Sequence, residues 1–292
     1  MASFVRFWGT RGSIPTPGHR TRVYGGNTSC VEVRVDDTLF VCDGGTGMRE
    51  LGDSLLRRSN GPLQAHLLFS HTHWDHIQGF PFFLPAYKPS TTLHIYDVER
   101  DDDRIHRLLL GQMRSEYFPV TFSDLGSKIV SSDLHGGNKV IEGVTVSAFE
   151  QRHPGRSFAF SLAKAGRKIV YATDSELDLM VVNADEAERD PRAQRRLPEE
   201  AIRFMRDADL LVADGQYNDD DYRKGWGHAR ANTVVDMAMQ AGAKQLAIFH
   251  HDPTQSDADV ERKVQVARDR ARAAGSNLVI FAAREGLELK VD

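Results

Sequence analysis

Short apolar segments rich in β-branched and aromatic residues recur along the chain, and turn-forming residues bound them. Segments of this length and composition are typical of buried strands. Stretches with helical spacing follow several of them, so strands and helices alternate over much of the chain. The predicted strands are Val31–Val35, Thr38–Cys42, Ala65–Phe69, Thr92–Tyr96, Val144–Phe149, Phe158–Leu162, Lys168–Ala172, Leu210–Ala213, Gln245–Phe249 and Asn277–Ala282.

The helical stretches complete the fold prediction. Strands in pairs near the N-terminus, followed by strand–helix alternation, predict an α/β (α+β) fold of two packed sheets with helices outside, a four-layer αββα sandwich. In the last helix, Ser256 or Asp257 is expected to cap the first turn, and Gly275 follows the last turn. The predicted helices are Met48–Arg57, Arg104–Ser115, Glu199–Asp207, Thr233–Gln240 and about Asp257–Ala274.

The length and charge of the chain limit the number of domains and the kinds of partner to expect. Layered folds use 292 residues as one unit and no Pro/Gly/Ser-rich linker is visible, so residues 1–292 are expected to form a single domain. There are 37 Lys and Arg against 41 Asp and Glu, a net charge of −4 that argues against a general polyanion binder. The acidic runs Asp101–Asp103 and Asp219–Asp221 are expected to be solvated loops.

Cys30 and Cys42 are too few for a disulfide framework, and both lie in strand-like segments. We therefore expect buried, reduced thiols and a cytoplasmic location. No apolar stretch approaches the ~20 residues of a membrane span. The N-terminus lacks a basic region followed by an apolar one, so neither a secretory signal nor a membrane partner is expected.

The most specific local pattern is HTHWDH at positions 71–76, directly after an apolar strand. Alternate residues of a strand face opposite sides, but a loop can turn His71, His73, Asp75 and His76 towards one point. Clustering these groups without a cation would bury an unpaired charge at considerable cost. Neutral imidazoles and a carboxylate suit zinc, manganese or iron, so the pattern predicts a metal site.

Further ligand-type residues recur where apolar strands end. The carboxyl ends of strands are where sites gather in layered α/β folds. One Asp in such a place would need only a turn-forming explanation, but the shared placement indicates a common site. His153, beside a Pro-Gly turn, and His228, at the start of a helical stretch, are further candidates. The residues that directly follow apolar strands are Asp43, Asp174, Asp214 and His250.

In this order the residues resemble the metallo-β-lactamase superfamily. Within it, the chain is most similar to the phosphodiesterase branch that includes ribonuclease Z and bacterial cyclic-nucleotide phosphodiesterases. WGTRGSIP at 8–15, followed by GGNTS at 25–29, is similar to the N-terminal loop of this branch. Asp214 stands where ribonuclease Z has a carboxylate that orients a histidine, and His228 stands where the branch has its catalytic histidine. Ala229 and Arg230 depart from the small hydroxyl residues usual after it.

The resemblance implies two divalent metal ions, with Zn²⁺ expected first and Mn²⁺ as the alternative. Asp43 resembles the structural Asp that braces the ligand loop. His251 is adjacent to His250 and leaves the last ligand open, but we favour His250 because it follows the strand directly. The implied ligands are His71, His73 and His153 for one ion, Asp75, His76 and His250 for the other, and Asp174 between them.

The resemblance also implies a reaction. A hydroxide held by two metals would attack the phosphorus of a small phosphodiester, most specifically a 3′,5′-cyclic nucleotide. His228 would protonate the departing ribose oxygen, Asp214 would fix its tautomer, and Asp75 is counted with this catalytic group. A polynucleotide is less favoured, because Leu179–Leu197 is short and charged where ribonuclease Z has a long Gly/Pro-rich arm, and because the net charge is negative.

Several alternatives stay open. The first is a ribonuclease Z-like endoribonuclease that processes tRNA 3′ ends, and the second is a lactone or carboxyl-ester hydrolase. A metal-bound sensing module without catalysis is the non-enzymatic alternative. β-Lactamase activity is not expected, because neither cysteine lies in a ligand motif. Members of the branch form dimers, and Arg104–Phe118 offers a partly apolar helical surface for a homodimer.

Overall fold

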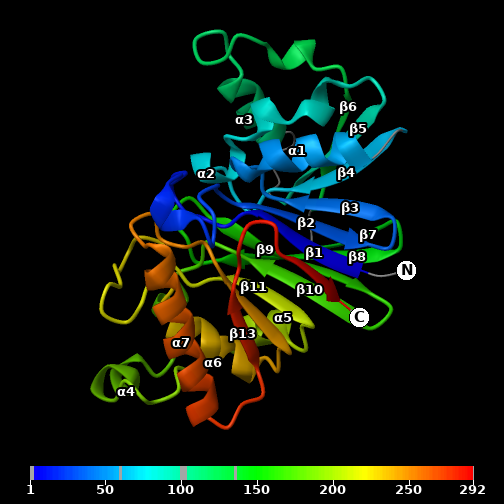
Figure 1. The fold of residues 1–292 in the computed structure, drawn as a ribbon. Coiled ribbons are helices and arrows are strands. Elements are labelled where there is room, and N and C mark those ends of the chain that lie inside the picture. Colours follow the sequence, from blue (N-terminus) through cyan, green and yellow to red (C-terminus); the bar gives the residue numbers. More distant parts are fainter. Residues whose placement is uncertain (1–2, 59–60, 99–103, 135–136, 292) are drawn as a thin grey trace.

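Two β-sheets lie face to face in the middle of the molecule, and helices cover their outer faces (Figure 1). This computed structural model describes residues 3–58, 61–98, 104–134 and 137–291. Within these residues each sheet has seven strands. The layered α/β arrangement confirms the predicted fold class. The run Asp101–Asp103 lies outside the described residues.

The first sheet is built mainly from the N-terminal half of the chain. Its first three strands in sequence pair antiparallel, and the later ones run parallel. The C-terminal strand closes this sheet by pairing with the N-terminal one, with Ser3 opposite Val291. In spatial order the strands are β14 (Glu288–Val291), β1 (Ser3–Gly9), β2 (Cys30–Val35), β3 (Thr38–Cys42), β4 (Leu63–Leu68), β5 (Thr91–Asp97) and β6 (Lys128–Asp133).

The second sheet is antiparallel at one end and parallel at the other. Parallel neighbours end at the same edge, so the residues that follow those strands are brought together. In spatial order the strands are β13 (Val279–Ala282), β12 (Gln245–Phe249), β11 (Leu210–Asp214), β10 (Arg167–Ala172), β9 (Ser157–Lys164), β8 (Val144–Gln151) and β7 (Asn138–Ile141).

The helices form the two outer layers. One apolar core joins α1 and α3 to the first sheet, and another joins α5, α6 and α7 to the second. Short 3₁₀ turns occur at His19–Thr21, Phe80–Phe82, Leu84–Tyr87, Phe122–Asp124 and Leu177–Met180. The α-helices are α1 (Gly47–Arg58), α2 (Trp74–Ile77), α3 (Arg104–Gln112), α4 (Ala184–Arg189), α5 (Glu199–Met205), α6 (Ala231–Gln240) and α7 (Asp257–Ala273).

The core between the sheets is aromatic. Phe7 and Phe40 of the first sheet meet Tyr171 and Phe249 of the second, and all four are fully buried. The rings of Tyr171 and Phe249 pack edge to face, with centroids 5.7 Å apart. Burying side chains of this size is worth about 1.5–3 kcal/mol each, so this layer holds the two sheets, and hence their loops, in register.

The ten predicted strands are confirmed, with ends within two residues of the expected ones. The last helix is also confirmed, because Ser256 forms a capping box with Asp259 and Gly275 follows with a φ of 67°. Strands β1, β6, β7 and β14 were not predicted from the sequence. Strands β6, β7 and β14 are short or half-exposed and end their sheets, so their side chains show no continuous apolar run.

The thiols of Cys30 and Cys42 are buried and unbridged, as expected, and burial raises the pKa of both well above its usual range. Among the described residues, no helix combines the length and apolarity needed to cross a membrane. The run Asp219–Asp221 is exposed, as predicted, although Asp219 also pairs with the guanidinium of buried Arg195 at 2.7 Å.

Candidate metal centre

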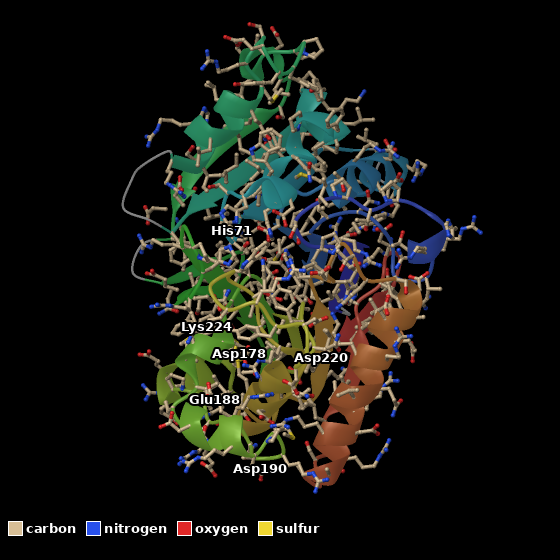
Figure 2. All side chains as sticks on the ribbon, turned by 90° about the vertical axis from the view of Figure 1, so that its left-hand side faces the viewer. His71, Asp178, Glu188, Asp190, Asp220 and Lys224 are labelled. Atoms are coloured by element: carbon tan, nitrogen blue, oxygen red, sulfur yellow. The ribbon has the colours of Figure 1, made fainter. Side chains whose placement is uncertain are left out.

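The ligand-type side chains predicted from the sequence converge at one edge of the two sheets. Figure 2 shows His71 at the junction between the N-terminal and C-terminal halves of the molecule. The HTHWDH segment follows β4, with α2 forming its second half. All seven residues assigned as ligands from the resemblance take part in groups whose ligand atoms lie within 4.8 Å of one another.

Three histidines form one side of the cluster. The imidazoles of His71, His73 and His153 make up a single close group. Nδ1 of His73 lies 3.2 Å from Nε2 of His153. The pKa of each of these three histidines is lowered, chiefly by burial, so the neutral imidazole is favoured. Neutral imidazole is the form that coordinates a metal.

Asp75, His76 and His250 form the other side. Oδ2 of Asp75 lies 3.2 Å from Nε2 of both histidines. The backbone N–H of Ser13 also donates to this oxygen at 2.7 Å. Burial alone would raise the pKa of Asp75, but His76 and His250 hold it well below its usual value, so Asp75 is a carboxylate.

Asp174 lies between the two sides and turns one oxygen to each. Its Oδ1 lies 3.2 Å from Nε2 of His76 and 3.3 Å from Nε2 of His250. Its Oδ2 lies 3.6 Å from Nε2 of His71 and 3.8 Å from Nε2 of His153. A carboxylate so placed could bind one cation through each of its two oxygens.

Two buried nitrogens of the cluster test whether a cation fits. Nε2 of His71 and Nε2 of His76 are buried, and within the described residues neither forms a hydrogen bond, although carboxylate oxygens lie 3.2–3.6 Å away. A buried polar atom without a partner costs about 1–3 kcal/mol. A divalent cation accepts a lone pair from each nitrogen and balances the nearby carboxylates. The residues present therefore fit His/Asp-ligated divalent metal ions.

The backbone is strained where three of these strands end. Asp43, Asp174 and His250 follow β3, β10 and β12, and their φ angles are 60°, 51° and 58°. Non-glycine residues rarely adopt positive φ, at a cost of order 1–3 kcal/mol. The left-handed turn redirects each side chain from the strand towards the junction, so the strain lies where the ligands are set.

Hydrogen bonds from outside the cluster orient its histidines. Oδ2 of Asp43 lies 2.7 Å from Nδ1 of His76, which leaves Nε2 facing the cluster. Asp43 also accepts hydrogen bonds from Ser70 and from the hydroxyl of Tyr171. Oε1 of Gln216 lies 3.0 Å from Nδ1 of His250. These acceptors favour a proton on Nδ1 in both rings.

The two adjacent histidines after β12 point in different directions. His250 joins the cluster, whereas Nε2 of His251 lies 2.9 Å from the backbone carbonyl of Ala283. The ring of His251 packs edge to face on Tyr24, with centroids 5.7 Å apart. The side chain of His251 therefore supports the loop after β12, and the structure favours His250 over His251 as a ligand.

His228 and Asp214 lie together beside the cluster. Oδ2 of Asp214 lies 2.8 Å from Nδ1 of His228, and both residues are buried. The rings of His228 and His250 stack with centroids 4.8 Å apart. Burial opposes a charge on His228, but Asp214 and the nearby carboxylates raise its pKa to about 9.

The sequence analysis missed two residues of this region. Gln216 stands two positions after Asp214, and Glu176 stands two positions after Asp174, so the placement after a strand could have indicated both. Glu176 is buried, and its carboxylate accepts hydrogen bonds from the backbone N–H groups of Gly225 and Gly227.

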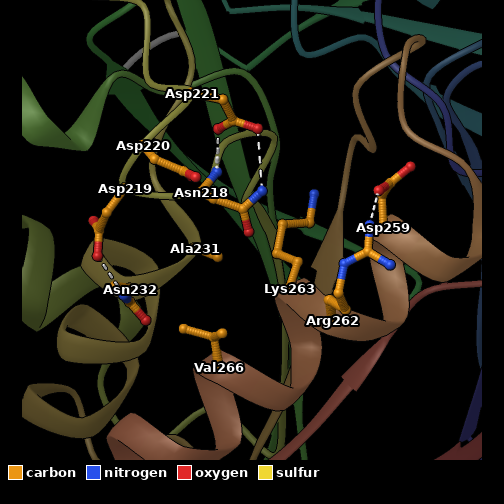
Figure 3. A pocket seen from close by; sticks show the side chains of 10 residues that line it. All are labelled: Asn218, Asp219, Asp220, Asp221, Ala231, Asn232, Asp259, Arg262, Lys263 and Val266. Atoms are coloured by element: carbon orange, nitrogen blue, oxygen red, sulfur yellow. Dashed lines mark hydrogen bonds and ion pairs between the residues drawn. The ribbon is translucent and has the colours of Figure 1, made fainter.

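A separate pocket of about 510 Å³ lies between the loop after β11 and helix α7 (Figure 3). Asp219, Asp220 and Asp221 line one side, and Arg262 and Lys263 of α7 line the other. The Nζ of Lys263 donates to the backbone carbonyl of Gln216 at 3.0 Å. None of the seven assigned ligands lines this pocket, so it is distinct from the cluster.

The fold and the His/Asp cluster together define a metal-dependent hydrolase of the metallo-β-lactamase type. Residues 38–251 match the family described as a beta-lactamase superfamily domain, so the chain belongs to this superfamily. Ribonuclease Z of Haloarcula marismortui is 25% identical over 327 aligned residues, covering 100% of this chain and 98% of that protein.

Two solved structures share the fold over nearly the whole length. The metallo-beta-lactamase fold protein YhfI of Bacillus subtilis superposes with a TM-score of 0.69 at 18% identity, covering 99% of each chain. The short form of human tRNase Z superposes with a TM-score of 0.64, also at 18% identity and 99% coverage of each chain.

Proposed function

We propose that this chain hydrolyses a phosphodiester bond in RNA. The carrying observation is the pair of His228 and Asp214, 2.8 Å apart, buried beside a cluster of His and Asp side chains. Such a pair can donate a proton to a leaving alkoxide, which phosphodiester cleavage requires. RNA is favoured because relatives named Ribonuclease Z match the chain over nearly its full length. This reverses the order of substrates expected from the sequence.

The assigned ligands would hold two metal ions, Zn²⁺ first and Mn²⁺ as the alternative. When bound, such ions lower the pKa of a water towards about 7 and stabilise charge on phosphoryl oxygens. Asp174 turns Oδ2 towards His71 and Oδ1 towards His76, and this arrangement supports two metal ions. The ligands are His71, His73 and His153 on one side, Asp75, His76 and His250 on the other, and Asp174 between them.

The chain's own groups account for the proton and for orientation. Asp214 accepts from Nδ1 of His228 and favours the charged imidazole, so Nε2 can deliver a proton to the departing oxygen. General-acid help of this kind is typically worth ~10²–10⁴-fold. Asp43 orients His76, and the N–H of Ser13 holds the Asp75 carboxylate in place.

A 3′,5′-cyclic nucleotide is the second candidate, and the segment Leu179–Leu197 favours it. Asn183 exchanges hydrogen bonds with the backbone of Gln194 and Arg196. The backbone N–H of Arg195 donates to Asp236 of α6. Both ends of the segment are therefore held against the helices of the second sheet, whereas α4 between them is exposed. The segment is short where ribonuclease Z has the long arm with which it grips tRNA.

One assay compares the substrates. The purified protein is loaded with Zn²⁺ or Mn²⁺ and incubated with a precursor tRNA, cyclic mononucleotides, bis(p-nitrophenyl) phosphate and a lactone. We expect turnover of the diesters, with the precursor tRNA cleaved at its 3′ side. Turnover of cyclic mononucleotides alone would replace RNA by the second candidate, and turnover of the lactone alone would refute phosphodiesterase activity.

We also propose a domain organisation, a cellular location and an oligomeric state for the protein. Residues 1–292 form one domain, which the pairing of β1 with β14 supports. The buried, unbridged Cys30 and Cys42 support a reducing, cytoplasmic location. Exposed Leu110 and Tyr117, near α3, support a homodimer through Arg104–Phe118, which sedimentation velocity of the purified protein tests.

A further inference from the structure

The loop between β11 and α6 presents two cations and a tryptophan to solvent directly before His228. Arg223, Lys224 and Trp226 are exposed, with Trp226 at 61%. The guanidinium carbon of Arg223 lies 5.1 Å from the centre of the Trp226 ring. An arginine at this distance from an indole face is a cation–π pair. Residues 222–227 are called the arm loop below.

A buried carboxylate anchors the arm loop. Oε1 of Glu176 accepts from the Tyr222 hydroxyl at 2.7 Å and from the Gly225 N–H at 2.5 Å, and Oε2 accepts from the Gly227 N–H at 2.9 Å. Glu176 is only 2% exposed. A carboxylate is costly to bury without such donors, so these bonds hold the loop in one position.

The arm loop touches the metal-type cluster at its C-terminal end. The backbone carbonyl of Gly227 lies 2.8 Å from Nδ1 of His153. A Cβ atom on Gly227 would lie 2.3 Å from the same nitrogen, so the glycine permits this close approach. Figure 2 shows Lys224 on the second-sheet side of the junction, below His71. The exposed side chains therefore stand at the border of the site.

We propose that the arm loop binds the substrate strand next to the scissile phosphate. Trp226 stacks on an unpaired base, and Arg223 and Lys224 contact flanking phosphates of single-stranded RNA. Aromatic platforms combined with cations are how single strands are bound without sequence readout. This proposal rests on the proposed RNA substrate.

Trp74 is an alternative stacking site, and we compare it with Trp226. Trp74 is 78% exposed and follows His73, which contacts His153 from the other side. Stacking on Trp74 would place the base beside the HTHWDH segment instead of beside the arm loop. Trp226 is favoured because Arg223 and Lys224 lie within three residues of it, so base and phosphate contacts come from one anchored loop.

The experiment measures cleavage and binding separately. The metal-loaded wild type is assayed first with bis(p-nitrophenyl) phosphate and with a single-stranded oligoribonucleotide that contains its cleavage site. Affinity is measured by fluorescence anisotropy with the labelled product strand, which is not cleaved. The variants are Trp226→Ala, Trp74→Ala, and the double variant Arg223→Ser with Lys224→Ser. A control double variant, Arg57→Ser with Lys128→Ser, removes two exposed cations at the far ends of α1 and β6.

We expect Trp226→Ala to raise KM and the product-strand Kd about tenfold or more, the range for loss of one stacked base. The Arg223/Lys224 double variant should lower the slope of log Kd against log salt concentration by about 1.4, from ~0.7 for each lost phosphate contact. The control double variant should leave Kd and the slope as in the wild type, because its cations lie at the opposite edge of the sheet.

Other outcomes overturn the proposal. A fall in kcat without a change in product-strand Kd would mean that the arm loop only supports His228. An increase in Kd for Trp74→Ala but not for Trp226→Ala would move the stacking site to the HTHWDH segment. If the wild type cleaves neither diester, the proposed function fails, but anisotropy still decides whether the arm loop binds RNA.

Discussion

Oδ2 of Asp214 lies 2.8 Å from Nδ1 of His228, and both side chains are buried. Because a carboxylate only accepts hydrogen bonds, this contact fixes the proton of the imidazole on Nδ1. Nε2 is then the atom that exchanges a proton with the substrate. The two residues come from the end of β11 and the start of the α6 region, so the sheet edge positions the acid relative to the metal ligands.

His228→Ala is expected to lower kcat on a diester by about 10²–10⁴-fold, because the leaving oxygen loses its proton donor. Metal content, measured by plasma mass spectrometry, should match the wild type, since His228 is not among the assigned ligands. His19→Ala, which removes an exposed histidine, is the control. Loss of metal in His228→Ala would show that His228 is a ligand instead of the acid.

Gly227→Ala is expected to displace His153 and reduce bound metal, because the new Cβ would lie 2.3 Å from its ring nitrogen. Gly225→Ala is the matched control. It lies in the same loop with a φ of 86° against 88°, but its Cβ would meet nothing within 4 Å. In both variants the left-handed backbone conformation of the new alanine costs about 1–2 kcal/mol. Equal metal content in the two would show that the contact with His153 is not needed.

Metal removal is expected to destabilise the protein. Chelation leaves Nε2 of His71 and His76 buried without a hydrogen bond, so excess EDTA should lower Tm in differential scanning fluorimetry. A ligand at a hundredfold excess over Kd stabilises by about 2.7 kcal/mol. His73→Ala, at a more exposed ligand position, should lose metal, activity and the response to EDTA together. Full metal content in this variant would remove His73 from the ligand set.

His250→Ala is expected to reduce metal content, whereas His251→Ala is expected to reduce thermal stability. His250 lies within hydrogen-bond distance of Asp75 and close to Asp174, so its loss should lower metal content. His251 contacts the carbonyl of Ala283 and the ring of Tyr24, so its loss should lower Tm while the metals remain bound. The reverse pattern in the metal analysis would exchange their roles.

Lys263 is expected to make stability rise with pH above 8. It is fully buried, and burial lowers its pKa from 10.5 to about 8. The unfolded chain therefore binds more protons between these values, so the unfolding free energy increases with pH. From pH 7.5 to 9.5 this amounts to roughly 2 kcal/mol at 1.36 kcal/mol per pKa unit. Other groups, His228 among them, also titrate in this range, so urea unfolding is compared between the two proteins: the change from pH 7.5 to 9.5 should be more favourable in the wild type than in Lys263→Met by this amount. The same change in unfolding free energy in both proteins would contradict the assignment.

Local patterns were sufficient for the elements and for most of the candidate site. The apolar runs located β3 and β12 residue for residue, and the Ser256 cap located the start of α7. Such features depend on side chains close in sequence. The placement of Asp43, Asp174 and His250 after strands also followed from the pattern, because parallel strands end at a common edge.

What the sequence by itself determined is therefore the kind of residue at each strand end and the layered class of the fold. The tertiary structure decided which of two adjacent histidines faces the cluster, that the N-terminal strand pairs with the C-terminal one, and that Glu176 anchors the arm loop. The physical reason is distance along the chain. A hydrogen bond such as Glu176 to Gly227 spans 51 residues, and no local periodicity records its partner.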